Sequence, residues 1–293
     1  MSNAAFIKEA VKSFLALLWS RRAYKFFIKD WTALEDLAGC REVLATMRFT
    51  RTLEPLPMER PTGRRLLILA PHPDDETLGA GGTILKAIRG GATVRTVYVT
   101  SGRPSLAEKM EQEALQVSEA VGYTAEFMRY SLHDIPLELK AQEKLAECIN
   151  RFEPEVIFLP FLLDDHDDHR RVSHLLHLAY RAGLLKRHFS IWAYQVYSTV
   201  FPNVLVDITG VAEEKAKTVD LWASQKASRD WAHYILGMNA FNSRFLKKPG
   251  QNYVESFLVL PSEEYFSLCQ VYFEKGGATA YYHPNYLRGL KAE

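Results

Sequence analysis

The 293-residue sequence contains little cysteine, and its cysteines do not form pairs. Cys40, Cys148 and Cys269 lie far apart in the chain. This spacing excludes the closely spaced cysteine pairs of structural zinc sites. It is typical of buried or free thiols in a reducing compartment.

An excess of charge of one sign is also lacking. The chain has 36 Lys and Arg residues against 35 Asp and Glu residues, a formal net charge of +1. So small a charge produces no field that attracts nucleic acid, and we expect no nucleic-acid partner. The opening residues 1–4 lack a basic region before an apolar core, so we expect no secretory signal and a cytoplasmic location.

Near the N-terminus no hydrophobic run is long enough to cross a bilayer. The longest, residues 14–19, is too short to span it, although residues 6–38 have apolar positions near helical spacing. Residues 21–31 are a mixture of basic and aromatic residues, which leaves two interpretations open for residues 14–31. This segment either contacts the inner face of a membrane peripherally or packs on the main domain or another subunit.

Hydrophobic residues make up 47% of the chain, enough for a full globular core. We expect an N-terminal helical extension and linker over residues 1–64, with prolines marking the linker over 50–64. One large domain, 65–293, follows and ends in a helical tail. The oligomeric state stays open.

From residue 65 onward, apolar strand patterns alternate with amphipathic helix patterns. Strands are predicted at 66–70, 93–100, 125–130, 156–160, 190–197 and 204–208, and helices at 77–89, 106–121, 138–152, 170–185, 211–224 and 229–245. Repeated strand–helix units predict an α/β fold with a Rossmann-like, mostly parallel sheet and helices on both faces.

Two of these strands run directly into ionisable residues. The strand at 66–70 is followed by Pro-His-Pro-Asp-Asp-Glu over 71–76, and the strand at 156–160 by Asp-Asp-His-Asp-Asp-His over 164–169. Ligands of open α/β sheets bind beyond the carboxyl ends of the strands. A catalytic zinc typically takes three protein ligands, and His72, Asp75 and His169 would provide them.

Taken singly, each motif has a simpler interpretation. Proline and aspartate favour turns for local reasons, so the first motif alone is compatible with a surface turn. The second motif alone is compatible with a solvated acidic loop. His174 and His177, one turn apart further along the same predicted helix, could also ligate a metal, but a core or surface role is favoured there.

Together and in this order, the two motifs resemble those of the PIG-L/LmbE-like family of zinc-dependent N-acetylglucosamine deacetylases. The family signatures, [A/P]-H-P-D-D-E and H-x-D-H, are matched at every functional position, and the resemblance covers about residues 65–261. It implies a hydrolase that removes an acetyl group from an N-acetylglucosamine-type sugar conjugate. Zinc is the expected metal, although iron(II) or cobalt suits the same ligands.

The resemblance also implies roles for individual residues. His72, Asp75 and His169 would hold the metal, and Asp74 would act as general base on a water molecule. His166 would steady the oxyanion or serve the leaving amine, as an imidazolium. Asp168 and Glu76 would orient the ligands without contacting the metal themselves.

Substrate contacts are less well defined by the sequence. The family often has an arginine three residues before the glutamate that matches Glu113, but Met110 stands there, so we expect Arg103 or Lys109 to take part instead. Glu255, in a segment similar to a late family motif, is a further candidate contact or a structural residue. A zinc amidase acting on a non-sugar amide and a non-catalytic binding protein on the same scaffold remain alternatives.

Overall fold

The computed structural model describes residues 40, 42–46, 54–226 and 228–275. The predicted helix over 6–38 and the proposed membrane contact over 14–31 lie outside these residues. Among the helices that are described, none is both long and apolar enough to cross a bilayer.

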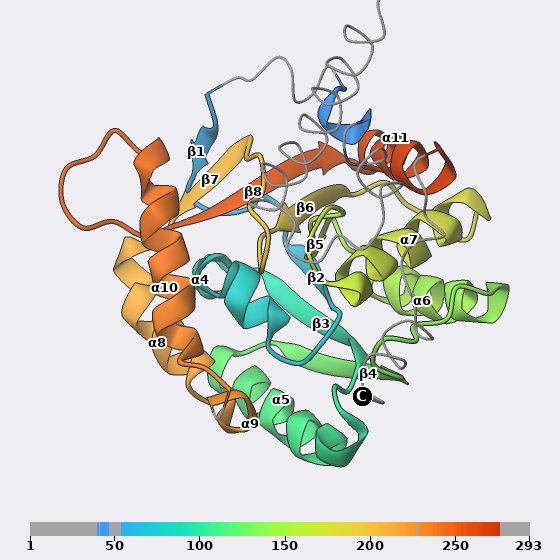
Figure 1. Ribbon diagram of the computed structural model, residues 1–293, viewed down its shortest axis with the longest axis horizontal. Coiled ribbons are helices and arrows are strands. Elements are labelled where there is room, and N and C mark those ends of the chain that lie inside the picture. Colours follow the sequence, from blue (N-terminus) through green and yellow to red (C-terminus); the bar gives the residue numbers. More distant parts are fainter. Residues whose placement is uncertain (1–39, 41, 47–53, 227, 276–293) are drawn as a thin grey trace, which may run out of the picture.

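A single eight-stranded sheet forms the centre of the molecule (Figure 1). Its strands are β1 (Leu56–Met58), β2 (Arg65–Ala70), β3 (Thr93–Thr100), β4 (Thr124–Tyr130), β5 (Val156–Pro160), β6 (Ser190–Tyr194), β7 (Val204–Asp207) and β8 (Val254–Pro261). The spatial order is β1-β7-β8-β6-β5-β2-β3-β4, and only β8 runs antiparallel to its neighbours. The prediction of a mostly parallel sheet is confirmed.

Helices cover both faces of the sheet, as predicted. The longer ones are α4 (Asp75–Arg89), α5 (Ala107–Val121), α6 (Leu139–Phe152), α7 (Asp167–Arg181), α8 (Ala212–Val219), α10 (Trp231–Asn242) and α11 (Ser262–Gln270), with the short α9 (Ala223–Lys226) between α8 and α10. One face packs against α4, α5, α8 and α10, and the other against α6, α7 and α11 (Figure 1). Alternate residues of β2 enter the two separate cores, which is why this strand is apolar throughout.

Several predicted boundaries were wrong. The linker contains β1, an edge strand that accommodates Pro57 because one side of the strand has no neighbour to receive an amide hydrogen bond. The helix predicted over 211–224 is broken into a 3-10 turn, α8 and α9. The helices predicted to start at 77 and 170 start two and three residues earlier, at Asp75 and Asp167, so the acidic residues that look like loop in the sequence form their first turns.

The glycine-rich start of α4 serves close packing. A Cβ atom at Gly79 would lie 2.1 Å from the Tyr194 ring, and one at Gly82 would lie 2.7 Å from Ile208. Glycine therefore lets α4 approach β6 and the end of β7 closely.

The sheet order brings the two predicted motifs together. β2 and β5 are adjacent and parallel, with Leu66 opposite Val156. Their carboxyl ends therefore lie at the same edge of the sheet. The loops that follow them lead directly into α4 and α7.

Candidate metal centre and its cleft

The loop after β2 delivers His72, Asp74 and Asp75. Asp74 caps α4 and has a φ angle of 117°, a left-handed conformation that is costly for a residue other than glycine. The side chain of Thr77 donates to the Asp74 carbonyl at 2.7 Å, and the amides of Thr77 and Leu78 donate to the same oxygen at 3.0 Å. These hydrogen bonds hold the strained backbone of Asp74 in place, next to Asp75.

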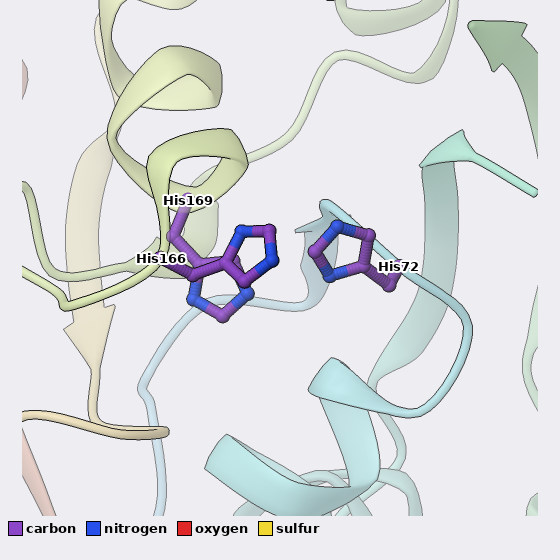
Figure 2. Close-up of side chains that lie close together, drawn as sticks. All are labelled: His72, His166 and His169. Atoms are coloured by element: carbon purple, nitrogen blue, oxygen red, sulfur yellow. The ribbon is translucent and has the colours of Figure 1, made fainter. Parts of the chain in front are cut away.

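The N-terminus of α7 delivers His166 and His169. His166 caps this helix, and its Nδ1 accepts a hydrogen bond from the Asp168 amide at 3.1 Å. His169 lies in the first turn and is fully buried. Figure 2 shows the rings of His72, His166 and His169 turned toward one another from these two elements.

One carboxylate oxygen lies between two of these imidazoles. Oδ2 of Asp75 is 3.1 Å from Nδ1 of His72 and 3.3 Å from Nε2 of His169. The three predicted ligands are therefore side by side in space, although Asp75 and His169 are 94 positions apart in the sequence. Asp75 therefore contacts one nitrogen of each of the two imidazoles.

The far nitrogen of each imidazole faces a second carboxylate. Nε2 of His72 is 2.9 Å from Oδ2 of Asp168, and Nδ1 of His169 is 2.9 Å from Oδ1 of Asp164. Metal-ligating histidines usually have such a partner, because it fixes the tautomer and makes the free nitrogen a better ligand. Asp168 was predicted in this role, whereas Asp164 was missed.

These residues fit a divalent cation. The second oxygen of Asp75, Oδ1, is buried and makes no hydrogen bond with the described residues. His72, His166 and His169 can each place one ring nitrogen within 4.8 Å of the others, so His166 also lies at the edge of the site. Nitrogen and carboxylate ligands in a site with an open side match a catalytic zinc centre.

The imidazoles and carboxylates of this cluster shift one another's pKa values. Burial opposes protonation of His72, but the Asp75 carboxylate and the hydrogen bond to Asp168 outweigh it and raise the pKa to about 9. Burial likewise opposes protonation of His169, but Asp75 and Asp164 raise its pKa to about 10. Burial opposes ionisation of Asp75, yet the two imidazoles lower its pKa below its usual range.

His166 differs from the two other histidines. Burial, followed by the charges of His72 and His169, lowers its pKa to about 2. Since Nδ1 accepts from a backbone amide, the neutral ring carries its proton on Nε2. The capping hydrogen bond and the lowered pKa favour a neutral hydrogen-bond donor over the imidazolium expected at His166.

The two other acidic residues of the first motif are buried differently. Burial and the neighbouring Asp75 raise the pKa of Asp74 well above its usual range. Glu76 is fully buried, with Oε2 accepting from the Asp74 amide at 3.3 Å and Oε1 from the Tyr123 hydroxyl at 2.9 Å. Burial raises the pKa of Glu76 to about 7. Glu76 thus supports the Asp74 backbone from behind.

A cleft of about 560 Å³ opens onto this centre. The predicted residues His72, Asp74, Arg103 and His166 line it. Ten further residues complete the lining, and none of them was predicted from the sequence as a site residue: Gly102, Leu106, Met110, Leu132, His133, Tyr197, Ser224, Gln225, Ser228 and Trp231. They come from loops and helix starts without a recognisable motif, which explains why the sequence did not reveal them.

Two predicted substrate contacts lie outside the cleft lining. The Glu255 carboxylate is buried, accepts from the amides of Gly82 and Thr83 at 2.8 Å, and pairs with Lys215. Its role is structural, because β8 places it under α4. Lys109 has a side chain that is 57% exposed and lies 3.9 Å from Glu113.

Comparison with known proteins agrees with this geometry. Residues 67–180, which include both motifs and every proposed ligand, match the profile of the family described as PIG-L, GlcNAc-PI de-N-acetylase. This match places the segment 67–180 in the PIG-L family. The family match ends at residue 180, before Tyr197 and Trp231, which also line the cleft.

Several known proteins resemble this chain in sequence or in fold. The diacetylchitobiose deacetylase of Thermococcus kodakarensis is 25% identical over 224 residues, covering 68% of this chain and 84% of the relative. A solved structure of a conserved protein from Thermus thermophilus has 26% identity and a TM-score of 0.58, covering 66% of this chain and 93% of its own. The N,N'-diacetylchitobiose deacetylase of Pyrococcus horikoshii has 21% identity and a TM-score of 0.61, covering 81% and 97%, and at this identity it shows the fold alone.

Proposed function

We propose that this protein is a zinc-dependent hydrolase that removes the acetyl group from an N-acetylglucosamine-type sugar conjugate. The observation that carries the proposal is the close approach of His72, Asp75 and His169, inside the segment that matches the family and beside a cleft that His72 and Asp74 line. The 25% identical relative from Thermococcus kodakarensis, a diacetylchitobiose deacetylase, supports the substrate class.

His72, Asp75 and His169 would hold the metal, with Asp168 and Asp164 orienting the two imidazoles. When bound, a divalent cation there polarises the acetyl carbonyl and makes a water molecule more acidic. Iron(II) or cobalt would fit the same set of ligands.

The protein's own groups would move the protons. Asp74 lies in the cleft beside Asp75, and its raised pKa suits a carboxylate that takes a proton from the attacking water. As the C–N bond breaks, that proton is passed to the leaving amine. His166 would donate from Nε2 to the carbonyl oxygen, which gains negative charge as water adds.

An acetate-release assay tests the proposal. Native protein loaded with zinc should release acetate from a panel of N-acetylglucosamine conjugates, and a chelator should abolish the release. Asp74→Ala should lose about 10²–10⁴-fold in kcat, while the bound metal, measured separately, stays at the native level. Release from simple N-acetyl amines but from no sugar would favour the non-sugar amidase, and native levels of release from Asp74→Ala would overturn the assignment of the base.

A further inference from the structure

The cleft extends well beyond the metal ligands. Four of its lining residues, Ser224, Gln225, Ser228 and Trp231, come from α9, the turn after it and the start of α10, and we call them the distal rim. None of the metal ligands lies on these elements. The rim therefore needs an explanation of its own.

A row of rings leads from the metal centre to the rim. The Tyr197 ring lies nearly parallel to His169, with centroids 5.5 Å apart and an angle of 26° between the planes. The Trp231 ring follows at 6.2 Å from Tyr197, turned by 67°. Trp231 therefore lies one aromatic ring beyond the metal centre, where the neighbouring unit of a bound conjugate would come.

The indole of Trp231 is held in place. Its Nε1 donates to Ser228 Oγ at 3.2 Å, and the Arg229 guanidinium lies 4.9 Å from the ring centroid. Tyr234 contacts it edge-on at 5.6 Å. A large ring fixed in this way loses little conformational freedom when a ligand packs against it.

The rim also offers a free polar group. Within the described residues, the side-chain amide of Gln225 makes no hydrogen bond, although it lines the cleft. An amide supplies two donors and an acceptor. A flat apolar surface next to such a group suits a sugar ring, which has an apolar C–H face and hydroxyls around its edge.

A buried carboxylate anchors the rim to the rest of the domain. Glu113 of α5 accepts from the Ser224 amide at 2.9 Å and from the Ser224 hydroxyl at 2.6 Å. Only 5% of Glu113 is exposed. Since its two oxygens fix the start of α9, Glu113 determines where the rim stands relative to the metal centre.

Building on the proposed deacetylase function, we propose that the distal rim is a subsite for a second sugar ring. Trp231 would stack on that ring and Gln225 would bind its hydroxyls, while Glu113 acts as a positioning residue. The preferred substrates are then N-acetylated disaccharides or longer glycans in which the reacting sugar carries a further ring.

The test compares two substrates on the zinc-loaded full chain. The ratio of kcat/KM for N,N'-diacetylchitobiose to that for N-acetylglucosamine should fall roughly three- to tenfold in Trp231→Ala, through KM. Trp231→Phe should keep most of the native ratio. Glu113→Gln should raise KM for the disaccharide and leave kcat near the native value. Phe241→Ala, at a residue of the same helix that is 51% exposed and outside the cleft lining, is the matched control and should keep the native ratio.

Three outcomes would overturn the subsite. One is an unchanged ratio in Trp231→Ala. Another is an equal loss on both substrates, which would indicate a general defect. The third is an equal loss on an octyl glycoside of N-acetylglucosamine, which would show that the rim recognises any apolar group.

Calorimetry separates this proposal from the function on which it rests. Disaccharide binding is measured to zinc-loaded Asp74→Asn, with and without Trp231→Ala. If the wild type releases no acetate but this variant binds the disaccharide and the added Trp231→Ala weakens binding, the subsite stands and the deacetylase proposal falls. If the wild type releases acetate and Trp231→Ala changes neither ratio nor binding, the deacetylase stands and the subsite falls.

Discussion

Two clusters of buried charge contact the same helix, α4, and only one of them opens into the cleft. The first is the His/Asp cluster at the N-terminus of α4. The second is the ion pair of Lys215 and Glu255, whose Nζ and Oε1 atoms lie 2.7 Å apart with both side chains fully buried. Both clusters contain fully buried charges, yet they differ in how completely their polar atoms are paired.

The ion pair is complete. Lys215 directs its three hydrogen bonds to Glu255, to the Leu78 carbonyl at 2.8 Å and to Asn239 at 3.0 Å. Both oxygens of Glu255 accept from amides of α4. Burial lowers the pKa of Lys215, and the Glu255 carboxylate opposes this effect. Nothing is left over to bind a ligand.

The His/Asp cluster is incomplete by comparison. Asp75 has an oxygen without a hydrogen bond, Asp74 has a strained backbone, and His72 and His166 line a cavity. The comparison shows that a buried charged group indicates a ligand site only when some of its polar atoms lack hydrogen-bond partners and the cluster borders a cavity. Four predictions sharpen this contrast, beginning with the largest effect.

Removing a metal ligand should cost activity before it costs the fold. We expect His169→Ala to lose bound zinc and to lower acetate release to background, because two ligands do not hold a catalytic zinc. Metal analysis, acetate assay and circular dichroism measure the three quantities. Zinc retained at the native level by a folded variant would contradict the assignment of His169.

Breaking the ion pair of Lys215 and Glu255 should lower the stability of the fold and leave zinc binding intact. Glu255→Ala leaves a buried ammonium without its partner and should lower the unfolding free energy by about 3–5 kcal/mol. Denaturant unfolding measures this change. Folded protein at low temperature should still bind zinc, because no metal ligand is altered.

Two further variants control the Glu255 experiment. The double variant Lys215→Met with Glu255→Leu should recover much of the stability, since it removes both charges. Glu213→Ala, which removes an exposed carboxylate from the same helix as Lys215, should stay near the wild type. A stable Glu255→Ala that has lost zinc would place Glu255 in the site after all.

The sequence predicted the first cluster far better than the second. His72, Asp75 and His169 follow apolar runs that are recognisable as strands, and strand ends of a parallel sheet gather at one edge. Glu255 and Lys215 carry no such signal, because their pairing depends on β8 entering the sheet antiparallel, beside β6 and β7. The sequence alone therefore leaves Glu255 as either a substrate contact or a structural residue.

Other features depended on packing that sequence patterns do not encode. The charge state of His166 follows from its position as the cap of α7, where a backbone amide occupies Nδ1. The distal rim depends on where α9 and α10 fold back over the cleft. Asp164 was recognised only as a member of an acidic run, because its distance from His169 is a property of the turn between β5 and α7.

The carboxylates behind the ligands should have an intermediate effect. Asp168→Asn keeps the shape of the side chain but removes the charge that faces Nε2 of His72. We expect zinc affinity to fall about 10–100-fold, measured by competition with a chelator. Asp167→Asn is the matched control on the same turn, since its carboxylate pairs with Arg170 instead. Equal losses in both variants would show that only the general negative charge matters.

The smallest expected effect contrasts histidines along α7 itself. Burial lowers the pKa of His174 to about 3 and that of His177 to about 4, so both stay neutral in the folded protein at pH values where they are charged in the unfolded chain. Below the pKa of about 6.5 in the unfolded chain, the unfolded state therefore binds protons that the native state does not. As the pH decreases through this range, the free energy of unfolding decreases by at most about 1.4 kcal/mol per pH unit for each histidine.

In metal-free protein, His72 and His169 contribute with the opposite sign. Their pKa values are raised, so their stabilisation is complete below about pH 6.5 and is lost as the pH rises through about 9 to 10. Denaturant unfolding of zinc-loaded protein between pH 7 and 5 measures the contribution of the α7 pair. His177→Leu should flatten this pH dependence, since it removes one group that the unfolded state protonates. An unchanged slope would mean that His177 is already charged in the native state, as the nearby Glu274, 3.6 Å away, would favour.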